Sequence, residues 1–228
     1  MRASATNIIC FGDSITAAAE FADHERWPSL LQAGLDAWRP GAYKVHNRGV
    51  GGDTTAHAFD RIESEVLPLL AGVLLVQFGF NDANVRDWAV VPRVGRGEFK
   101  KNLREFHRIA RTHGGRCVFI VNHTVAAVTG KQGNGLHYND NMKPYDMAIR
   151  EVAQMCQAAV IDLPALMAQR RVAPELFVVD DGLHLSALGN RLYAEMVFAA
   201  LKEILVASGE KRDRFSNNHD VSAGDLRA

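Results

Sequence analysis

The chain alternates between two hydrophobic patterns along most of its length. Five short runs rich in β-branched or aromatic residues have the length of strands, and they cover residues 7–12, 43–49, 73–78, 116–122 and 158–163. Between these runs, apolar residues recur at three- and four-residue spacing, as in Ile62, Val66 and Leu69. That spacing is typical of one face of a helix. The pattern therefore predicts strands and helices in alternation.

Two segments carry signals for the start of a helix. The stretch from Asn141 to Pro144 supplies cap-type side chains and then a proline suited to a first turn. Ser186 precedes a long periodic segment that includes Leu188 and Leu192. We expect one helix to begin near Asn141 and another directly after Ser186.

The predicted third strand is apolar on both faces, since Val73 to Val76 contains no polar residue. Strands of this kind occur in parallel sheets that helices cover on each side. The sequence thus predicts a flavodoxin-like three-layer α/β/α sandwich with a five-stranded parallel sheet. No Pro-, Gly- or Ser-rich linker and no internal repeat divides the chain. We expect one domain over residues 1–207 and a polar C-terminal tail over residues 208–228.

Two stretches, residues 81–97 and 123–140, lack a clear period and are longer than usual connections. Long loops in compact domains often carry function, so both are expected to border the site. The tail, residues 208–228, has a composition that favours disorder. It contains Arg212, Arg214 and Phe215, residue types that interfaces favour. We expect it to contact a neighbouring subunit and form a homo-oligomer.

Composition refines this picture mainly by exclusion. The 228 residues include 26 Lys and Arg and 26 Asp and Glu, a formal net charge of zero. No overall field therefore attracts nucleic acid. The apolar run Ile8 to Phe11 is interrupted by Gly12 and Asp13 before a signal segment or membrane span is complete. We expect a soluble, cytoplasmic protein without a nucleic-acid partner or a membrane span.

The three cysteines, Cys10, Cys117 and Cys156, are isolated in apolar surroundings. They show neither a CxxC spacing nor a Cys/His ligand spacing, which argues against a disulfide framework and against a zinc site. We interpret them as thiols of the hydrophobic core.

Four short blocks contain residues of catalytic types, and they run from Phe11 to Thr16, from Asn47 to Thr54, from Phe78 to Asp82 and from Asp180 to His184. Each block alone has an ordinary explanation, because glycines turn the chain and Asp or Ser caps helices. The first three, however, follow predicted parallel strands, whose carboxyl ends form the site of open α/β sheets. Together the blocks predict a single crevice.

A hydrolytic serine needs a base, a carboxylate that orients the base, and donors for the oxyanion of the tetrahedral intermediate. Ser14, His184 and Asp181 fit the first three roles, and the three-residue spacing lets Asp181 and His184 share one tight loop. Gly52 and Asn81 fit the role of oxyanion donors. This chemistry requires no cofactor and no metal.

In this order, the blocks Gly-Asp-Ser, Gly, Gly-x-Asn-Asp and Asp-x-x-His resemble those of the SGNH hydrolase (GDSL esterase/lipase) superfamily. The resemblance extends from the first strand to the last helix. It implies the strand order 2-1-3-4-5 and the triad Ser14, Asp181 and His184. It also implies an oxyanion hole made by the backbone N–H groups of Ser14 and Gly52 and by the side chain of Asn81. The implied function is a serine esterase that hydrolyses small-molecule carboxylic esters, with a short acyl or acetyl group, through an acyl-enzyme.

Some assignments within this site stay open. Gly51 is adjacent to Gly52, and Asp180 competes with Asp181 for the orienting role. The same residues would equally serve a carbohydrate O-deacetylase, a thioesterase or a lysophospholipase.

Two rival classes also stay open. A metal-dependent phosphoesterase would use Asp13, Asn81, Asp82 and His184 as ligands, and a non-catalytic flavodoxin-like binding module would use none of them. We expect Asp13 and Asp82 to bond backbone N–H groups at their turns instead. A final pair of histidines, His123 and His137, brackets the second long loop and is expected at the surface or beside the site, with substrate contact as the alternative.

Overall fold

The computed structural model describes residues 4–127 and 130–219, and for residues 208–219 only the backbone is considered. Its strands are β1 Thr6–Gly12, β2 Tyr43–Gly49, β3 Val73–Gln77, β4 Arg116–Val121 and β5 Ala159–Asp162. They form one parallel sheet in the order β2-β1-β3-β4-β5. The predicted α/β sandwich and its strand order are confirmed.

The middle of the sheet is the centre of the hydrophobic core. All five residues of β3 are buried, and so are Ile8 to Gly12 of β1 and Cys117 to Val121 of β4. Strands that are apolar on both faces need helices on both sides of the sheet. The apolar runs of the sequence therefore fix which strands lie inside.

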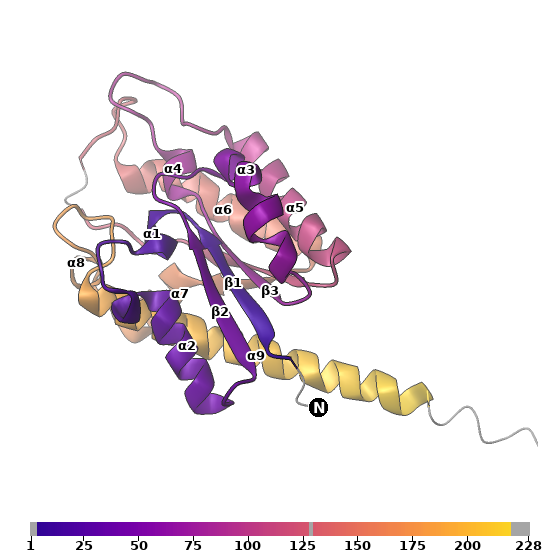
Figure 1. The fold of residues 1–228 in the computed structure, drawn as a ribbon. Coiled ribbons are helices and arrows are strands. Elements are labelled where there is room, and N and C mark those ends of the chain that lie inside the picture. The colour runs from indigo at the N-terminus through magenta and orange to yellow at the C-terminus, as the bar shows by residue number, and fades with distance from the viewer. Residues whose placement is uncertain (1–3, 128–129, 220–228) are drawn as a thin grey trace, which may run out of the picture.

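The helices cover both faces. They are α1 Ser14–Ala17, α2 Trp27–Trp38, α3 Thr55–Glu65, α4 Phe80–Ala83, α5 Arg96–Thr112, α6 Tyr138–Cys156, α7 Leu163–Arg170, α8 Pro174–Phe177 and α9 Ala187–His219, with short 3₁₀ helices η1 Asp23–Glu25 and η2 Leu67–Leu69. Helices α2, α7 and α9 pack together on one side of the sheet, and α3, α5 and α6 pack on the other (Figure 1). The short helices α1 and α4 lie at the same end of the sheet, where β1 and β3 finish.

One of the two predicted helix starts is confirmed and one is wrong. Helix α9 begins directly after Ser186, whose Oγ accepts a hydrogen bond of 2.9 Å from the N–H of Gly189. Helix α6 begins at Tyr138, before the expected start near Asn141, and contains Pro144 in its interior. The added turn is stabilised by packing, because Tyr138 is buried and its hydroxyl donates to the carbonyl of Phe80.

The three cysteines are free, with Cys10 and Cys117 buried and Cys156 partly buried. Burial raises the pKa of both buried thiols well above its usual value. Their interpretation as core residues is confirmed. Within residues 4–127 and 130–219, no helix combines the length and the apolar composition that crossing a membrane requires.

The last helix continues beyond the expected domain boundary. The backbone of residues 208–219 is helical as part of α9, although the composition of this segment favours disorder. A helix that extends an already packed helix needs no new nucleus, which explains the difference. Figure 1 shows this end of α9 projecting beyond the sheet, away from α1 and α4. Residues 220–228 of the predicted tail lie outside the described residues, and its role in a homo-oligomer stays a prediction.

Candidate active site

Ser14 is the first residue of α1, at the turn that follows β1. Asp13 caps this helix, and its Oδ1 accepts a hydrogen bond of 3.0 Å from the N–H of Ile15. Asp13 is completely buried, and burial raises the pKa of its carboxyl to about 7. As expected, Asp13 bonds the backbone of its own turn. The turn that carries the Ser14 hydroxyl is therefore held in place by the buried Asp13.

A series of hydrogen bonds through two buried amide side chains supports this turn. The hydroxyl of Thr16 donates to Gln77 Oε1 at 2.8 Å, and Gln77 Nε2 donates to Asn122 Oδ1 at 2.8 Å. Asn122 Nδ2 in turn donates to the carbonyl of Phe78 at 2.8 Å. The series links the carboxyl ends of β1, β3 and β4. Sequence reasoning missed Gln77 and Asn122, whose signal is a polar residue at the end of a buried strand.

His184 and Asp181 lie on the loop between α8 and α9. Ser14 Oγ is 2.9 Å from His184 Nε2, and His184 Nδ1 is 2.6 Å from Asp181 Oδ2. Asp181 Oδ1 accepts from the backbone N–H groups of Leu183 and His184 at 2.8 and 2.9 Å. Partial burial opposes ionisation of Asp181, but these hydrogen bonds hold the pKa of its carboxyl below the ordinary value. Asp180 and Asp181 are both exposed, but the carboxylate that bonds the imidazole belongs to Asp181.

The 181–184 loop is fastened at its base and on its flank. Its base is closed by an antiparallel bridge between Val178 and Leu185. On its flank, His123 Nε2 lies 2.8 Å from the carbonyl of Leu183 and donates to it. The His123 ring is buried between Phe80 and Phe177, and burial lowers its pKa to about 4. His123 thus supports the loop in its neutral form.

The glycine pair after β2 borders the serine. A Cβ placed on Gly51 would lie 4.0 Å from Ser14 Cβ, and Gly52 has a φ of 79°, which favours glycine. Both residues lie in an exposed turn that Asp53 connects to Thr54, the N-cap of α3. The geometry thus places a glycine turn beside Ser14. The choice of the Gly52 N–H over that of Gly51 as the oxyanion donor stays a prediction.

Asn81 lies in α4, directly after β3. Its Oδ1 accepts a hydrogen bond of 3.0 Å from Arg93 Nη1, and Arg93 Nη2 donates to the carbonyl of Gly52 at 3.0 Å. One guanidinium therefore connects the two residues that the sequence predicts as oxyanion donors. Arg93 lies in the first long loop, but no spacing singled it out.

Asp82, in α4, is bonded to the start of α3. Its Oδ1 accepts from the N–H and the hydroxyl of Thr55 at 2.9 and 2.5 Å, and Asn102 donates to the same hydroxyl at 3.1 Å. Burial raises the pKa of Asp82 to about 6. Asp82 thus anchors the first turn of α3, in the expected structural role. Among the described residues, no group of three or more His, Cys, Asp or Glu side chains is arranged to hold a metal.

The two long connections meet above the strand ends. The N–H of Val85 donates to Gln132 Oε1 at 3.1 Å, and the carbonyl of Val85 accepts from Gly133 at 3.3 Å. Between them lies a cavity of about 510 Å³, whose walls are polar and apolar in nearly equal parts and include Arg86, Lys131 and Asp181. His137, unlike His123, is exposed at the start of α6.

The site combines a serine hydroxyl bonded to an imidazole with a carboxylate bonded to the same imidazole, and donors lie nearby at the carboxyl edge of a parallel sheet. This arrangement is that of a hydrolase site. The chain matches the model of the GDSL-like Lipase/Acylhydrolase family over residues 10–192. It therefore belongs to this family, which includes esterases and lipases, and the resemblance seen in the four blocks is confirmed.

Two curated relatives match part of the chain. It is 28% identical over 137 residues to the uncharacterized lipoprotein YqeF of Bacillus subtilis (strain 168), which is 58% of this chain and 52% of that protein. It is 27% identical over 119 residues to the esterase TesA of Pseudomonas aeruginosa, which is 52% of this chain and 55% of TesA. The matches thus span about half the length of each relative.

Solved structures match over most of the fold. The lipase/acylhydrolase from Enterococcus faecalis has a TM-score of 0.71 and 25% identity, covering 87% of this chain and 96% of that one. The acetyl xylan esterase AlAXEase has a TM-score of 0.68 and 21% identity, covering 85% of this chain and 98% of that one. The second likeness concerns the fold alone.

Proposed function

We propose that the protein is a serine esterase that hydrolyses carboxylic esters of short acyl groups through an acyl-enzyme intermediate. The observation that carries the proposal is the chain of hydrogen bonds from Ser14 Oγ to His184 Nε2 at 2.9 Å and from His184 Nδ1 to Asp181 at 2.6 Å. Both distances lie in the range required for proton transfer from a nucleophile to its base.

In the acylation step, Ser14 Oγ attacks the carbonyl carbon of the ester while His184 Nε2 accepts the hydroxyl proton. The tetrahedral intermediate collapses when the bond to the alcohol oxygen breaks, and His184 returns its proton to that oxygen. Asp181 accepts the Nδ1–H of the imidazole, which fixes the tautomer and stabilises the imidazolium. In deacylation, His184 takes a proton from water as the hydroxyl attacks the acyl carbon. The second tetrahedral intermediate collapses when the bond to Ser14 Oγ breaks, His184 returns the proton to Oγ, and the carboxylic acid is released.

The negative oxygen of each intermediate needs donors that are already oriented. The backbone N–H groups of Ser14 and Gly52 and the Nδ2 of Asn81 are assigned to this role. Two features support the assignment. Ser14 starts a helix, where N–H groups lack partners within the helix, and Asn81 Oδ1 is engaged by Arg93, which leaves its amide nitrogen to face another partner.

A polar alcohol portion of the substrate is the second aspect of the proposal. The leaving oxygen must lie near His184, which protonates it, and the cavity of about 510 Å³ has Asp181 and Leu183 in its wall on that side. The other walls carry Arg86, Lys131 and the exposed Trp88. Charged groups and an aromatic ring suit a hydroxylated or sugar-like alcohol better than an alkyl chain. An acetylated carbohydrate is therefore the favoured substrate class.

The experiment is a panel of p-nitrophenyl esters from acetyl to long acyl chains, measured beside acetylated mono- and oligosaccharides with release of acetate as the readout. The proposal expects the highest kcat/KM at the shortest acyl chains, turnover of at least some acetylated sugars, and no effect of chelators. Turnover that is lost with a chelator and regained with a divalent metal would instead support the metal-dependent phosphoesterase class. A preference for long chains would contradict the substrate class but not the reaction.

A further inference from the structure

We propose that Arg93 is a positioning residue that orients the amide of Asn81, an assigned oxyanion donor, and holds the carbonyl of Gly52, whose own N–H is the second assigned donor. The inference rests on the proposed esterase function and adds to it a residue outside the four sequence blocks. Its basis is one guanidinium that donates to Asn81 Oδ1 and to the Gly52 carbonyl, each at 3.0 Å.

The chemistry of the guanidinium decides which end of the Asn81 amide faces the site. An arginine side chain has only donors, so the atom of Asn81 that meets it must be the oxygen. The amide nitrogen then points away from Arg93 and is available as a donor. Without Arg93, a rotation of the amide by half a turn would present the oxygen to the developing oxyanion, which would repel it.

The backbone around Arg93 holds the side chain at this place. The loop leaves α4 at Asn84 and returns to this residue, because the N–H of Arg93 donates to the carbonyl of Asn84 at 3.1 Å. The N–H of the next residue, Val94, donates to the carbonyl of Asp82 at 3.1 Å. The carbonyl of Val94 also accepts from the buried hydroxyl of Tyr145. The backbone of Arg93 and Val94 is thus bonded to residues that lie within three positions of Asn81.

Charge adds to position. Hydrogen bonds from an ionised donor are stronger than neutral ones, so Arg93 polarises the Asn81 amide and makes its N–H a better donor. The planar fork also reaches two acceptors at once, which a lysine cannot reproduce with the same geometry. Because the oxyanion exists only after attack, this contribution should appear in kcat and hardly in KM.

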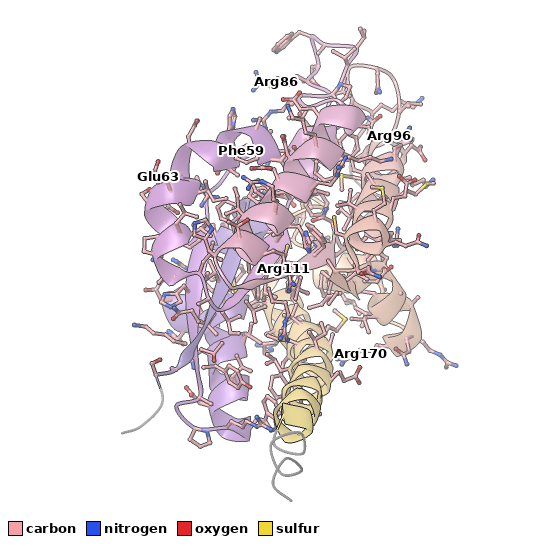
Figure 2. All side chains as sticks on the ribbon, turned by 90° about the vertical axis from the view of Figure 1, so that its right-hand side faces the viewer. Phe59, Glu63, Arg86, Arg96, Arg111 and Arg170 are labelled. Carbon is pink, nitrogen blue, oxygen red and sulfur yellow. The ribbon has the colours of Figure 1, made fainter. Side chains whose placement is uncertain are left out.

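The test compares Arg93→Met with Arg96→Met. Both substitutions remove an arginine charge and keep an unbranched side chain. Arg96, however, is exposed at the start of α5. Figure 2 labels it near the same end of the molecule as Arg86. With p-nitrophenyl acetate, Arg93→Met should lower kcat by about 10–100-fold and change KM by less than about threefold. Arg96→Met should leave both parameters at the wild-type level.

A double-mutant cycle separates positioning from a general structural role. In the Asn81→Ala background, Arg93→Met should cost clearly less than in the wild type, because the amide that Arg93 orients is gone and only its contact with the Gly52 carbonyl remains. An equal loss in both backgrounds, or an unchanged kcat in Arg93→Met, would overturn the inference. If urea unfolding shows that Arg93→Met does not fold, the cycle is repeated with Arg93→Lys. A smaller loss of kcat is then expected, which should again shrink in the Asn81→Ala background, and an equal loss in both backgrounds would overturn the inference.

Two further measurements, turnover of Ser14→Ala and the ester panel, distinguish a failure of this inference from a failure of the proposed function. Wild-type turnover that disappears in Ser14→Ala supports the esterase whatever Arg93 does. A wild-type protein that turns over no ester in the panel overturns both.

Discussion

The turn that carries Ser14 and the loop that carries Asp181 and His184 meet at one site but are held in opposite ways. The Ser14 turn is fixed by distant residues, since Arg61 donates to the carbonyl of Gly12 and Gln77 accepts from Thr16. The 181–184 loop is fixed mainly by its own backbone, through Asp181, and is partly exposed. A change in the buried residues that support the turn should therefore affect the folded state, whereas a change in the loop should affect the chemistry.

The largest expected effect comes from Ser14→Ala, which removes the nucleophile but no buried contact. It should lower kcat by about 10³-fold or more and leave the free energy of unfolding unchanged. The matched control is Ser64→Ala on the exposed side of α3, which should retain full turnover. Turnover in Ser14→Ala above a tenth of the wild-type kcat would remove Ser14 from the mechanism.

The loop is tested by Asp181→Asn, which keeps the shape of the side chain and removes its charge. An amide that donates toward Nδ1 favours the wrong imidazole tautomer, so kcat should fall by about 10²–10³-fold. Thermal unfolding should change little, because the loop is exposed. Asp180→Asn is the neighbouring control and should behave like the wild type. A larger loss in Asp180→Asn than in Asp181→Asn would exchange their roles.

Support of the Ser14 turn is tested by Thr16→Val, which removes a fully buried hydroxyl of nearly the same size. Gln77 Oε1 would lose its 2.8 Å donor without access to water. An unpaired buried acceptor costs about 1–3 kcal/mol, and urea unfolding measures this loss. The comparison would fail if Thr16→Val were as stable as the wild type or if Asp181→Asn were the less stable of the two.

The smallest effect concerns pH, where the two aspartates should act with opposite sign. Burial raises the pKa of Asp13 from 3.8 to about 7, so the native state binds this proton more tightly than the unfolded state. Its contribution to stability is present at low pH and is lost as pH rises through that window. Hydrogen bonds keep the pKa of Asp181 below its ordinary value, so its contribution is present above that value and is lost as pH falls.

Urea unfolding from about pH 2.5 to about pH 8, on both sides of the ordinary value of 3.8, measures this difference in sign. Relative to the wild type, Asp13→Asn should gain stability as pH rises from 3.8 to about 7. Asp181→Asn should instead show its largest relative gain at the acid end. Parallel pH profiles for the two variants would contradict the assigned environments.

The parts that could be predicted from the sequence are those encoded in short segments. Each of the five strands follows from a short run of its own, and the Asp181–His184 pair is visible because both residues belong to one loop. The strand order came from the family resemblance. Gln77 with Asn122, His123 with Leu183, and Arg93 with Asn81 could not be predicted, because their contacts join positions 45, 60 and 12 residues apart. The start of α6 was wrong for the same reason, since Tyr138 is held by Phe80.

The central claim is that Ser14 attacks substrate with the help of His184. It is tested most directly by treating the protein with a p-nitrophenyl phosphonate ester and following intact mass and peptide maps. The account predicts one adduct per chain on the peptide that contains Ser14, slow labelling in His184→Ala, and no labelling in Ser14→Ala. Labelling that persists in Ser14→Ala, or an adduct on another serine with loss of activity, would contradict it.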